Sequence, residues 1–183
     1  DWNDALDMAW EKGERVAFTC AYAGNVRNIA KTLRQLEEIS GSSKIEIAHE
    51  MEDLLAGSVE LYEDAARKQA LLAGYAKKCE HNISGDTIVV RLDQLAANLE
   101  EKADWMMKNI RANEWVKDGE DGWFNGYYDN HGRKVEGVMD ESVRMMLTGQ
   151  VFAIMSGTAT EDQVESICRS ADKYLYDQKA GGY

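Results

Sequence analysis

The sequence contains no proline in 183 residues, and this absence constrains the fold more than any other feature. Average usage would give roughly nine prolines in a chain of this length. Proline is the usual breaker of helix interiors, because it lacks the backbone N–H and clashes with the preceding turn. The sequence therefore favours long helices joined by short loops.

Apolar residues recur at helical spacing in several segments, as on one face of an amphipathic helix. The polar cluster Ser40-Gly41-Ser42-Ser43 interrupts this pattern, and Thr160 with Gln163 three residues later fits a capping box that starts a helix. The predicted helices span about residues 14–39, 44–79, 92–112 and 147–156, and a last one begins after Thr160.

Two segments have the character of extended chain. Ile88-Val89-Val90 is a β-branched run behind a Ser-Gly-Asp turn signal, which predicts a brief strand. The aromatic segment 123–128 precedes the turn signal Asn130-His131-Gly132, which leads into residues 133–135. This order predicts a β-hairpin.

Several long helices with one inserted hairpin predict an all-α fold, either an array of α-hairpins or a toroid. The chain begins Asp1-Trp2-Asn3-Asp4 without an initiator Met and stops at Gly181-Gly182-Tyr183. So few helices cannot hide all of their apolar faces. We therefore expect a single domain, residues 1–183, that is truncated at both ends and leaves apolar faces exposed.

The composition narrows the choice of partners and compartment. The formal net charge of −12 argues against nucleic acid as a partner, because an acidic surface repels phosphate backbones. No apolar run approaches the ~18–20 residues that cross a bilayer, and no signal peptide opens the chain, so we expect a cytoplasmic protein without a membrane partner. Cys20, Cys79 and Cys168 are far apart and predict buried reduced thiols rather than a metal site.

The segment with most chemical content is Asp1-Trp2-Asn3-Asp4-Ala5-Leu6-Asp7. Its three carboxylates, spaced by three, share one face of a helix or cluster in a loop. A carboxyl group beside an indole can be partly desolvated, which raises its pKa and lets it act as a general acid near neutral pH. The same spacing is typical of an acidic helix start that the helix dipole favours. Spacing alone leaves both interpretations open.

Two further groups have a polar or aromatic character suited to sugars. The amide of Gln150 can reach a sugar hydroxyl. The aromatic residues of segment 123–128 can form a stacking platform, and alternation would put Trp123 and Tyr127 on one face and Phe124 and Tyr128 on the other. At least one of these pairs is expected to be core.

The opening segment Asp1-Trp2-Asn3-Asp4-Ala5-Leu6-Asp7 resembles the signature of glycoside hydrolase family 94, the cellobiose, chitobiose and 1,2-β-oligoglucan phosphorylases. The resemblance continues in residues 16–25, 122–132 and 147–157, and it is strongest to the 1,2-β-oligoglucan branch. It implies that residues 1–183 form part of an (α/α)6-barrel catalytic domain with a short β-hairpin insertion.

The resemblance also implies roles for two residues. Asp4 falls on the general acid, and Trp2 falls on the residue that lines the sugar subsite beside the broken bond. Asp4 would protonate the glycosidic oxygen while inorganic phosphate attacks the anomeric carbon from the opposite face, giving α-glucose 1-phosphate with inversion. Phosphate is already an adequate nucleophile, so the second carboxylate of an inverting hydrolase is not needed. The substrates would be a β-gluco-oligosaccharide and phosphate, with no other cofactor and no metal.

The sequence departs from the family pattern in extent. The family's phosphate-binding His, Thr-Gly and Arg have no match here, and Thr148-Gly149 is not carried over because it lies in a predicted helix. The chain alone is therefore not expected to turn over substrate. The alternatives are another acceptor such as cellobiose, the phosphorylase-like domain of a cyclic glucan synthase, or a non-catalytic helical module that binds carbohydrate or a protein. The oligomeric state is not predicted.

Overall fold

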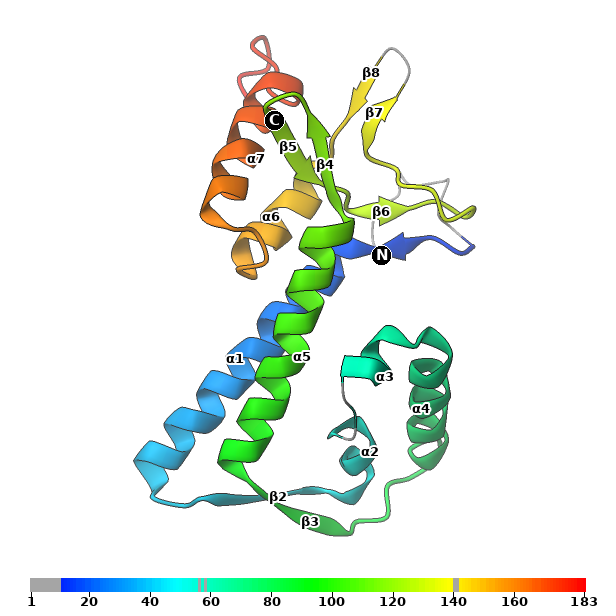
Figure 1. Cartoon of the computed structure of the whole chain (residues 1–183), viewed down its shortest axis with the longest axis vertical. Helices are drawn as coiled ribbons and strands as arrows, with labels where there is room; N and C mark the ends of the chain where they lie inside the picture. The colour runs from blue at the N-terminus through cyan, green and yellow to red at the C-terminus, as the bar shows by residue number, and fades with distance from the viewer. Residues whose placement is uncertain (1–10, 56, 58, 140–141) are drawn as a thin grey trace. The chain divides into compact units, whose positions relative to one another are not determined.

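Helices dominate the computed structural model of the chain, which describes residues 11–55, 57, 59–139 and 142–183 (Figure 1). Within these ranges the strands form two-stranded antiparallel sheets. The prediction of a helix-rich chain is confirmed. The helices are α1 (Val16–Ser40), the 3-10 turn η2 (His49–Met51), α2 (Glu52–Leu55), α3 (Val59–Glu63), α4 (Ala65–Lys78), α5 (Leu92–Asn113), α6 (Leu147–Met155) and α7 (Glu161–Tyr174).

The strands are short and pair in twos. Strand β1 pairs with β6, β2 with β3, β4 with β5, and β7 with β8. Their bounds are β1 (Glu14–Arg15), β2 (Lys44–Ala48), β3 (Thr87–Arg91), β4 (Trp115–Asp118), β5 (Asp121–Phe124), β6 (Tyr127–Tyr128), β7 (Gly137–Met139) and β8 (Ser142–Arg144).

The chain divides into two compact units, and the divisions fall inside α1 and α5. Unit 1 comprises Asp1–Val26 and Ala103–Tyr183, and unit 2 comprises Arg27–Lys102. Among the described residues, none of the helices combines the length and the apolar character needed to span a membrane.

Unit 1 has an aromatic core between the β4–β5 hairpin and helices α6 and α7, which lie beside it in Figure 1. Trp123 and Phe124 of β5 are 0% and 1% exposed. The Ser170 hydroxyl of α7 accepts from the Gly122 N–H at 3.0 Å and lies 3.1 Å from the Gly122 carbonyl. These contacts fix α7 against the hairpin. The predicted capping box between Thr160 and Gln163 starts α7 and is confirmed.

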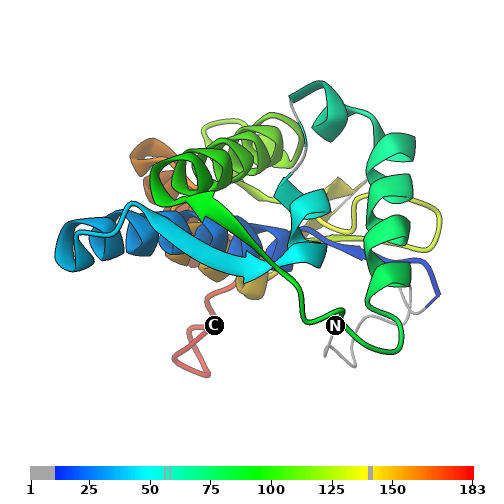
Figure 2. The same cartoon turned by 90° about the horizontal axis from the view of Figure 1, so that it is seen from below.

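Unit 2 has a smaller, aliphatic core. Ala30 and Leu33 of α1 pack against Leu92 and Ala96 of α5. Helix α4 has no buried residue, although Asp64 caps its start by accepting from the Arg67 N–H at 3.0 Å. Figure 2 shows β2 and β3 side by side, and the short helices and α4 lie between them along the chain.

The predicted helix over residues 44–79 is wrong for its first part. Lys44–Ala48 forms β2, and α4 begins only at Ala65. The residues of β2 alternate between polar and apolar, which is the period of a strand, and they pair antiparallel with β3. The brief strand predicted at Ile88-Val89-Val90 is confirmed as part of β3. Because β3 pairs with residues 44–48, these residues form a strand rather than a helix.

The predicted hairpin over residues 123–135 is confirmed for residues 127–135 but not for residues 123–126. Asp129 and Gly132 close the turn, with the Gly132 N–H donating to the Asp129 carbonyl at 3.0 Å and Gly132 at φ +72°. Beyond it, the Asp129 N–H donates to the Arg133 carbonyl at 2.9 Å, the Val135 N–H donates to the Tyr127 carbonyl at 3.0 Å, and an isolated bridge joins Tyr128 to Lys134. The aromatic segment also pairs with other strands, because β5 takes β4 as its partner and β6 takes β1.

The other predicted elements agree with the structure. Helix α1 ends at Ser40 before Gly41, whose φ of +66° suits glycine, and α5 and α6 begin and end within two residues of prediction. Cys20 is buried as expected, whereas Cys168 is exposed. Exposed apolar faces are also found on α1 and α6. They include Phe18, Tyr22, Ile29, Leu36, Ile39, Leu147, Val151, Ile154 and Met155.

Candidate functional site

The predicted general acid Asp4 and the predicted sugar-stacking residue Trp2 lie outside the described residues. The described chain that follows them begins at Glu11 and runs through β1 into α1. The surroundings of residues 11–17 are therefore where the structure bears on the predicted catalytic segment.

Residues 11–17 run along residues 126–130 from one end to the other. The N–H groups of Val16 and Ala17, at the start of α1, donate to the Gly126 carbonyl at 2.9 and 3.3 Å. In β1, Arg15 and Glu14 then pair with Tyr127 and Tyr128 of β6. At the far end, the N–H groups of Glu11 and Lys12 donate to the side chain of Asn130. We call residues 126–130 the anchoring segment.

Gln150 of α6 holds the chain just before the anchoring segment. Its amide oxygen accepts from the Phe124 N–H at 2.8 Å, and its amide nitrogen donates to the Phe124 carbonyl at 2.8 Å. The nitrogen also donates to the Met146 carbonyl at 3.1 Å, and the residue is 1% exposed. The predicted contact between Gln150 and a sugar hydroxyl is not supported, because the amide is buried and engaged by the backbone.

Glu136 is a buried carboxyl group in the same place. Its Oε1 accepts from the Gly126 N–H at 2.7 Å and its Oε2 from the Met146 N–H at 2.8 Å. Burial raises the pKa of Glu136 to about 8, and the two N–H donors oppose this rise. Because both oxygens face the protein's own backbone and the residue is 1% exposed, Glu136 organises the site rather than meeting substrate.

Asn125 completes this set of buried side chains. Its Oδ1 accepts from the Glu136 N–H at 3.2 Å, and its Nδ2 donates to the Glu114 carboxylate at 3.2 Å. We call Asn125, Glu136 and Gln150 the polar cluster. Together they fix the backbone from Phe124 to Gly126, and hence the carbonyl on which α1 begins.

Two glycines let the backbone of the anchoring segment approach α6. A Cβ at Gly126 would lie 2.8 Å from Glu136 Oε1 and 3.3 Å from the Cα of Gly149. A Cβ at Gly149 would lie 3.1 Å from the Cα of Gly126. Thr148 and Gly149 thus belong to helix α6, which packs closely against the anchoring segment. The pair was predicted to lie in a helix and for that reason was not assigned as a phosphate site.

The aromatic residues of this region serve the core. Trp123, Phe124 and Tyr127 are each at most 1% exposed. Phe124 packs edge-on against Trp115 at a centroid distance of 4.8 Å, and Trp123 contacts Tyr174 at 5.5 Å. Both aromatic pairs therefore contribute at least one core residue, and these three rings do not form a sugar platform.

A polar hollow of about 190 Å³ lies beside the anchoring segment. It is smaller than the roughly 300–1,000 Å³ of ordinary ligand pockets, so it can form only part of a substrate site. Its chemical character suits hydroxyl groups, since it combines carboxylates, a phenol and an amide. Its lining residues are Glu14, Arg15, Val16, Thr19, Asn109, Ile110, Glu114 and Tyr128.

The carboxylate of Glu114 in this hollow is an acceptor. The Tyr128 hydroxyl donates to it with 2.9 Å to both oxygens, and the Lys134 ammonium lies 3.7 Å away. Desolvation, followed by the bond to Glu114, raises the pKa of Tyr128 and keeps its hydroxyl protonated. Glu114 therefore acts as a hydrogen-bond acceptor in this hollow.

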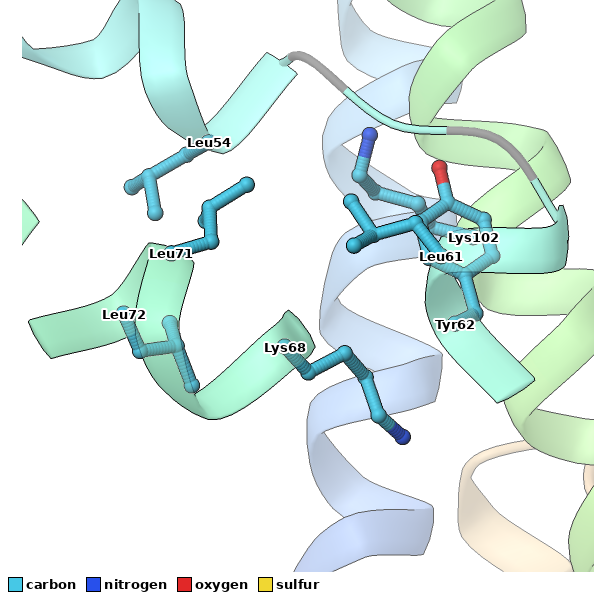
Figure 3. Close-up of a pocket in the computed structure, with 7 residues that line it drawn as sticks. All are labelled: Leu54, Leu61, Tyr62, Lys68, Leu71, Leu72 and Lys102. Atoms are coloured by element: carbon cyan, nitrogen blue, oxygen red, sulfur yellow. The ribbon is translucent and has the colours of Figure 1, made fainter. Parts of the chain in front are cut away.

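A second hollow, of about 160 Å³, lies within unit 2. Figure 3 shows leucines from several helices facing a common space, with Lys102 beside Tyr62. Its lining comprises Leu54, Leu61, Tyr62, Lys68, Leu71, Leu72 and Lys102. This largely aliphatic wall offers few partners for sugar hydroxyls, so the hollow in unit 1 is the better candidate. In the described part of the chain, no cluster of three or more histidine, cysteine, aspartate or glutamate side chains is arranged to hold a metal ion.

Sequence reasoning missed Glu114, Glu136 and Asn130. Glu114 and Glu136 carry no motif of their own. For Asn130 the available signal was Asn130-His131-Gly132, which predicted a turn but not its contact with a segment about 118 positions earlier.

Comparison with known families decides the class of the protein. The family model described as the glycosyl hydrolase 94 superfamily, catalytic domain, matches residues 89–182, just over half of the chain. The chain belongs to the glycosyl hydrolase 94 superfamily. No curated protein matches the chain.

The range matched by the glycosyl hydrolase 94 superfamily includes much of the candidate site in unit 1. The superfamily is one of carbohydrate-active enzymes and includes glycoside phosphorylases. The matched residues run from β3 to the end of the chain's last turn and contain the polar cluster and the anchoring segment. Residues 1–17, with the predicted acid, precede the matched range.

Proposed function

We propose that this chain is part of the catalytic domain of an inverting glycoside phosphorylase. The reaction is the transfer of a glucosyl group from a β-linked gluco-oligosaccharide, 1,2-linked in the first instance, to inorganic phosphate. Residues 1–183 form part of an (α/α)6 barrel in this proposal, and the enzyme works in the cytoplasm with phosphate as co-substrate and no other cofactor. The observation that carries it is the match of residues 89–182 to the family's catalytic domain.

The chemistry assigns one proton donor. Asp4 gives its carboxyl proton to the glycosidic oxygen, the bond from that oxygen to the anomeric carbon breaks, and a phosphate oxygen forms the new bond from the opposite face. The products are α-glucose 1-phosphate and a shortened saccharide, and Asp4 is left as a carboxylate that regains a proton from solvent. Trp2 holds the sugar beside the broken bond by stacking.

The hydrogen bonds of the described residues support the assignment of Asp4 as the proton donor. The carboxyl group of Glu114 accepts hydrogen bonds from Tyr128, and that of Glu136 is buried and bonded to backbone N–H groups, so both are engaged by the protein itself. The anchoring segment binds residues 11–17 and borders a hollow lined by polar groups.

The test uses the whole protein product of the gene. Phosphate release from α-glucose 1-phosphate is measured with sophorose, cellobiose and glucose as acceptors. Sophorose is expected to be the best acceptor, and the best acceptor reports the linkage. Activity with cellobiose instead would move the proposal to another specificity, and no turnover with any acceptor would end it.

A substitution pair tests the acid. Asp4→Asn is expected to lower kcat by about 10²- to 10⁴-fold, the usual contribution of a general acid. Sugar binding, measured by calorimetry, is expected to be retained. Asp7→Asn, three residues further along the same acidic segment, is the matched control and is expected to keep most activity. Equal loss in both variants would point to an acidic segment with a structural role only.

A further inference from the structure

The polar hollow of unit 1 lies where three parts of the chain meet. Strand β1 and the first turn of α1 contribute one set of lining residues, the last turn of α5 and the residue after it contribute a second, and β6 contributes a third. Figure 1 shows these elements close together. Every lining residue belongs to unit 1, so the hollow is formed within a single compact unit.

Two of the lining side chains, those of Glu114 and Tyr128, are held in place by the protein itself. The Glu114 N–H donates to the Ile110 carbonyl at 2.8 Å, and the Glu114 carbonyl accepts from the Asn125 N–H at 2.8 Å. Tyr128 pairs with Glu14 across β1 and β6. Because the Tyr128 hydroxyl donates to the Glu114 carboxylate, its oxygen is left to accept from another hydroxyl group. Groups that are already ordered lose little entropy when a ligand binds.

The other polar lining groups keep hydrogen-bonding capacity for a ligand. The Glu14 side chain is exposed, and it makes no hydrogen bond or ion pair with any residue that the structure describes. The Asn109 Oδ1 accepts from Asn113 Nδ2 at 2.7 Å, which leaves the Asn109 amide protons to donate. The Thr19 hydroxyl donates to the Arg15 carbonyl at 2.9 Å, so its oxygen can still accept.

The charges around the hollow favour an uncharged ligand that is rich in hydroxyl groups. The carboxylates of Glu14 and Glu114 repel phosphate and other anions. The Arg15 guanidinium lies 3.9 Å from the centre of the Phe18 ring, and the Lys134 ammonium lies 3.7 Å from the Glu114 carboxylate, so cations of the protein already stand beside these acids. Hydroxyl groups donate to carboxylates and accept from amides, and a sugar ring carries several of them side by side.

We propose that this hollow is a binding subsite for one sugar ring of the saccharide, in which Glu14, Glu114 and Tyr128 accept from sugar hydroxyls and Asn109 donates to one. The inference rests on the proposed function, which supplies the identity of the saccharide. The volume of about 190 Å³ lies below the roughly 300 Å³ at which pockets for whole ligands begin, so the hollow takes one ring of a longer chain. These side chains bind the sugar and take no part in the chemical step.

The first experiment labels exposed carboxylates of the whole protein with a carbodiimide and an amine, and reads each site by mass spectrometry. Saturating sophorose or cellobiose is expected to slow labelling of Glu14 about threefold or more, because a bound hydroxyl group engages its carboxylate. Inorganic phosphate alone is expected to leave this rate unchanged. Glu120, exposed on the turn between β4 and β5, is the internal control and should react equally under all three conditions.

The second experiment uses two substitutions that keep the shape of the side chain. Glu14→Gln and Tyr128→Phe are each expected to raise the Kd for the saccharide, measured by calorimetry, about 3- to 10-fold, which corresponds to one hydrogen bond. In phosphorolysis each should raise KM by a similar factor and leave kcat within about twofold, because the subsite binds substrate and transition state alike. Glu120→Gln is the matched control and should change neither constant. Should Tyr128→Phe fail to fold, Asn109→Ala at the exposed end of α5 takes its place.

The outcomes separate this inference from the proposed function. Unchanged labelling of Glu14 with both saccharides would overturn the inference, and so would protection by phosphate alone, which would indicate an anion site. A lower kcat with wild-type Kd in Glu14→Gln and Tyr128→Phe would also overturn it, because these side chains would then have a structural role only. A protein that turns over no acceptor ends the proposed function, whereas protection of Glu14 by saccharide in that protein would still support a sugar site.

Discussion

Unit 1 buries the side chains of Asn125, Glu136 and Gln150 against its own backbone, whereas unit 2 buries a small aliphatic cluster around Leu33 and Leu92. Among the described residues, seven of the eight buried polar side chains belong to unit 1, and only Glu50 belongs to unit 2. A buried amide or carboxyl group is stable only with partners at hydrogen-bond distance. Unit 1 therefore specifies one arrangement of its backbone, while unit 2 has few such constraints.

The difference follows the family match. The matched range, residues 89–182, covers nearly all of the later segment of unit 1 and only the end of unit 2. The buried polar contacts also converge on Phe124 and Gly126, which lead into the anchoring segment. We infer that the buried polar contacts of unit 1 serve the site, and that changes in unit 2 have smaller consequences for the proposed reaction.

The largest effect is expected from Gln150→Ala. The change leaves the Phe124 N–H and carbonyl without partners inside the core, at about 1–3 kcal/mol each, and adds a cavity. The free energy of unfolding, measured by urea denaturation, is expected to fall by about 3–5 kcal/mol. Gln69→Ala, on exposed helix α4 of unit 2, is the control and should change it by about 0.5 kcal/mol or less.

The same variant decides between two roles of Gln150. A raised KM for saccharide together with unchanged stability would restore the predicted sugar contact. It would also weaken the contrast between the units, since the buried amide of unit 1 would then not be a structural requirement.

The second prediction concerns pH. Because the folded-state pKa of Glu136 is raised to about 8, the folded state holds this proton more tightly than the unfolded chain, whose glutamate pKa is about 4.3. The contribution of Glu136 to the free energy of unfolding is therefore fully present below about pH 4.3. It decreases as pH rises toward 8, by about 1.4 kcal/mol per pH unit. Glu136→Gln should remove this slope.

Glu50 of unit 2 is expected to behave in the opposite way. The N–H of Ser84, which donates to it at 2.7 Å, lowers its pKa to about 2, so its stabilising contribution is present above about pH 4.3 and is lost as pH falls.

The pH dependence of Glu136 can be measured in unit 1 alone. All five tryptophans belong to unit 1, so tryptophan fluorescence during denaturation reports that unit. Equal slopes in wild type and Glu136→Gln between pH 5 and 8 would contradict the assignment.

Local signals predicted the parts of the fold that depend on local contacts. The capping box of α7 joins Thr160 to Gln163, and both partners lie within one turn, so the sequence was sufficient. The pairing of β5 with β4 is a tight local hairpin that was not predicted, whereas Lys44–Ala48 was assigned to a helix because its partner strand begins about 40 residues later. Pairing at such distances depends on packing that a local pattern does not contain.

The site was predictable only in part, for the same physical reason. An amide at a helical position, such as Gln150, suits a core contact and a sugar contact equally well, and only Phe124, 26 residues earlier, decides between them. Glu136 has no local motif, and its raised pKa comes from burial by segments on either side. Asn130 was part of a predicted turn, but the backbone it binds lies near the other end of the chain.

The third prediction tests close backbone packing. Gly126→Ala places a methyl group 2.8 Å from Glu136 Oε1 and 3.3 Å from the Cα of Gly149. Such overpacking is expected to lower the free energy of unfolding by about 1–3 kcal/mol. Gly74→Ala in α4 of unit 2 meets nothing within 4 Å and should raise it by about 0.5–1 kcal/mol, as alanine is the better helix former. Effects of the same sign in both would remove the contrast between the units.

The smallest effect is expected from the surface ion pair of unit 2. Arg34 donates to both oxygens of Glu100 at 2.8 and 2.5 Å, but the side chains are 45% and 36% exposed. A double-mutant cycle with Arg34→Ala and Glu100→Ala should give a coupling energy below about 1 kcal/mol that fades in 1 M salt, where the Debye length is about 3 Å.

The pair Lys173–Asp121 of unit 1 is the matched comparison for that cycle. Its atoms lie 2.7 Å apart, and Asp121 is only 15% exposed, so water and salt screen it less. The Lys173 ammonium lowers the pKa of Asp121, as the Arg34 guanidinium lowers that of Glu100. The coupling energy in unit 1 should exceed that in unit 2 and survive salt better. The reverse order would mean that unit 2 depends on surface charge more than its small aliphatic core suggests.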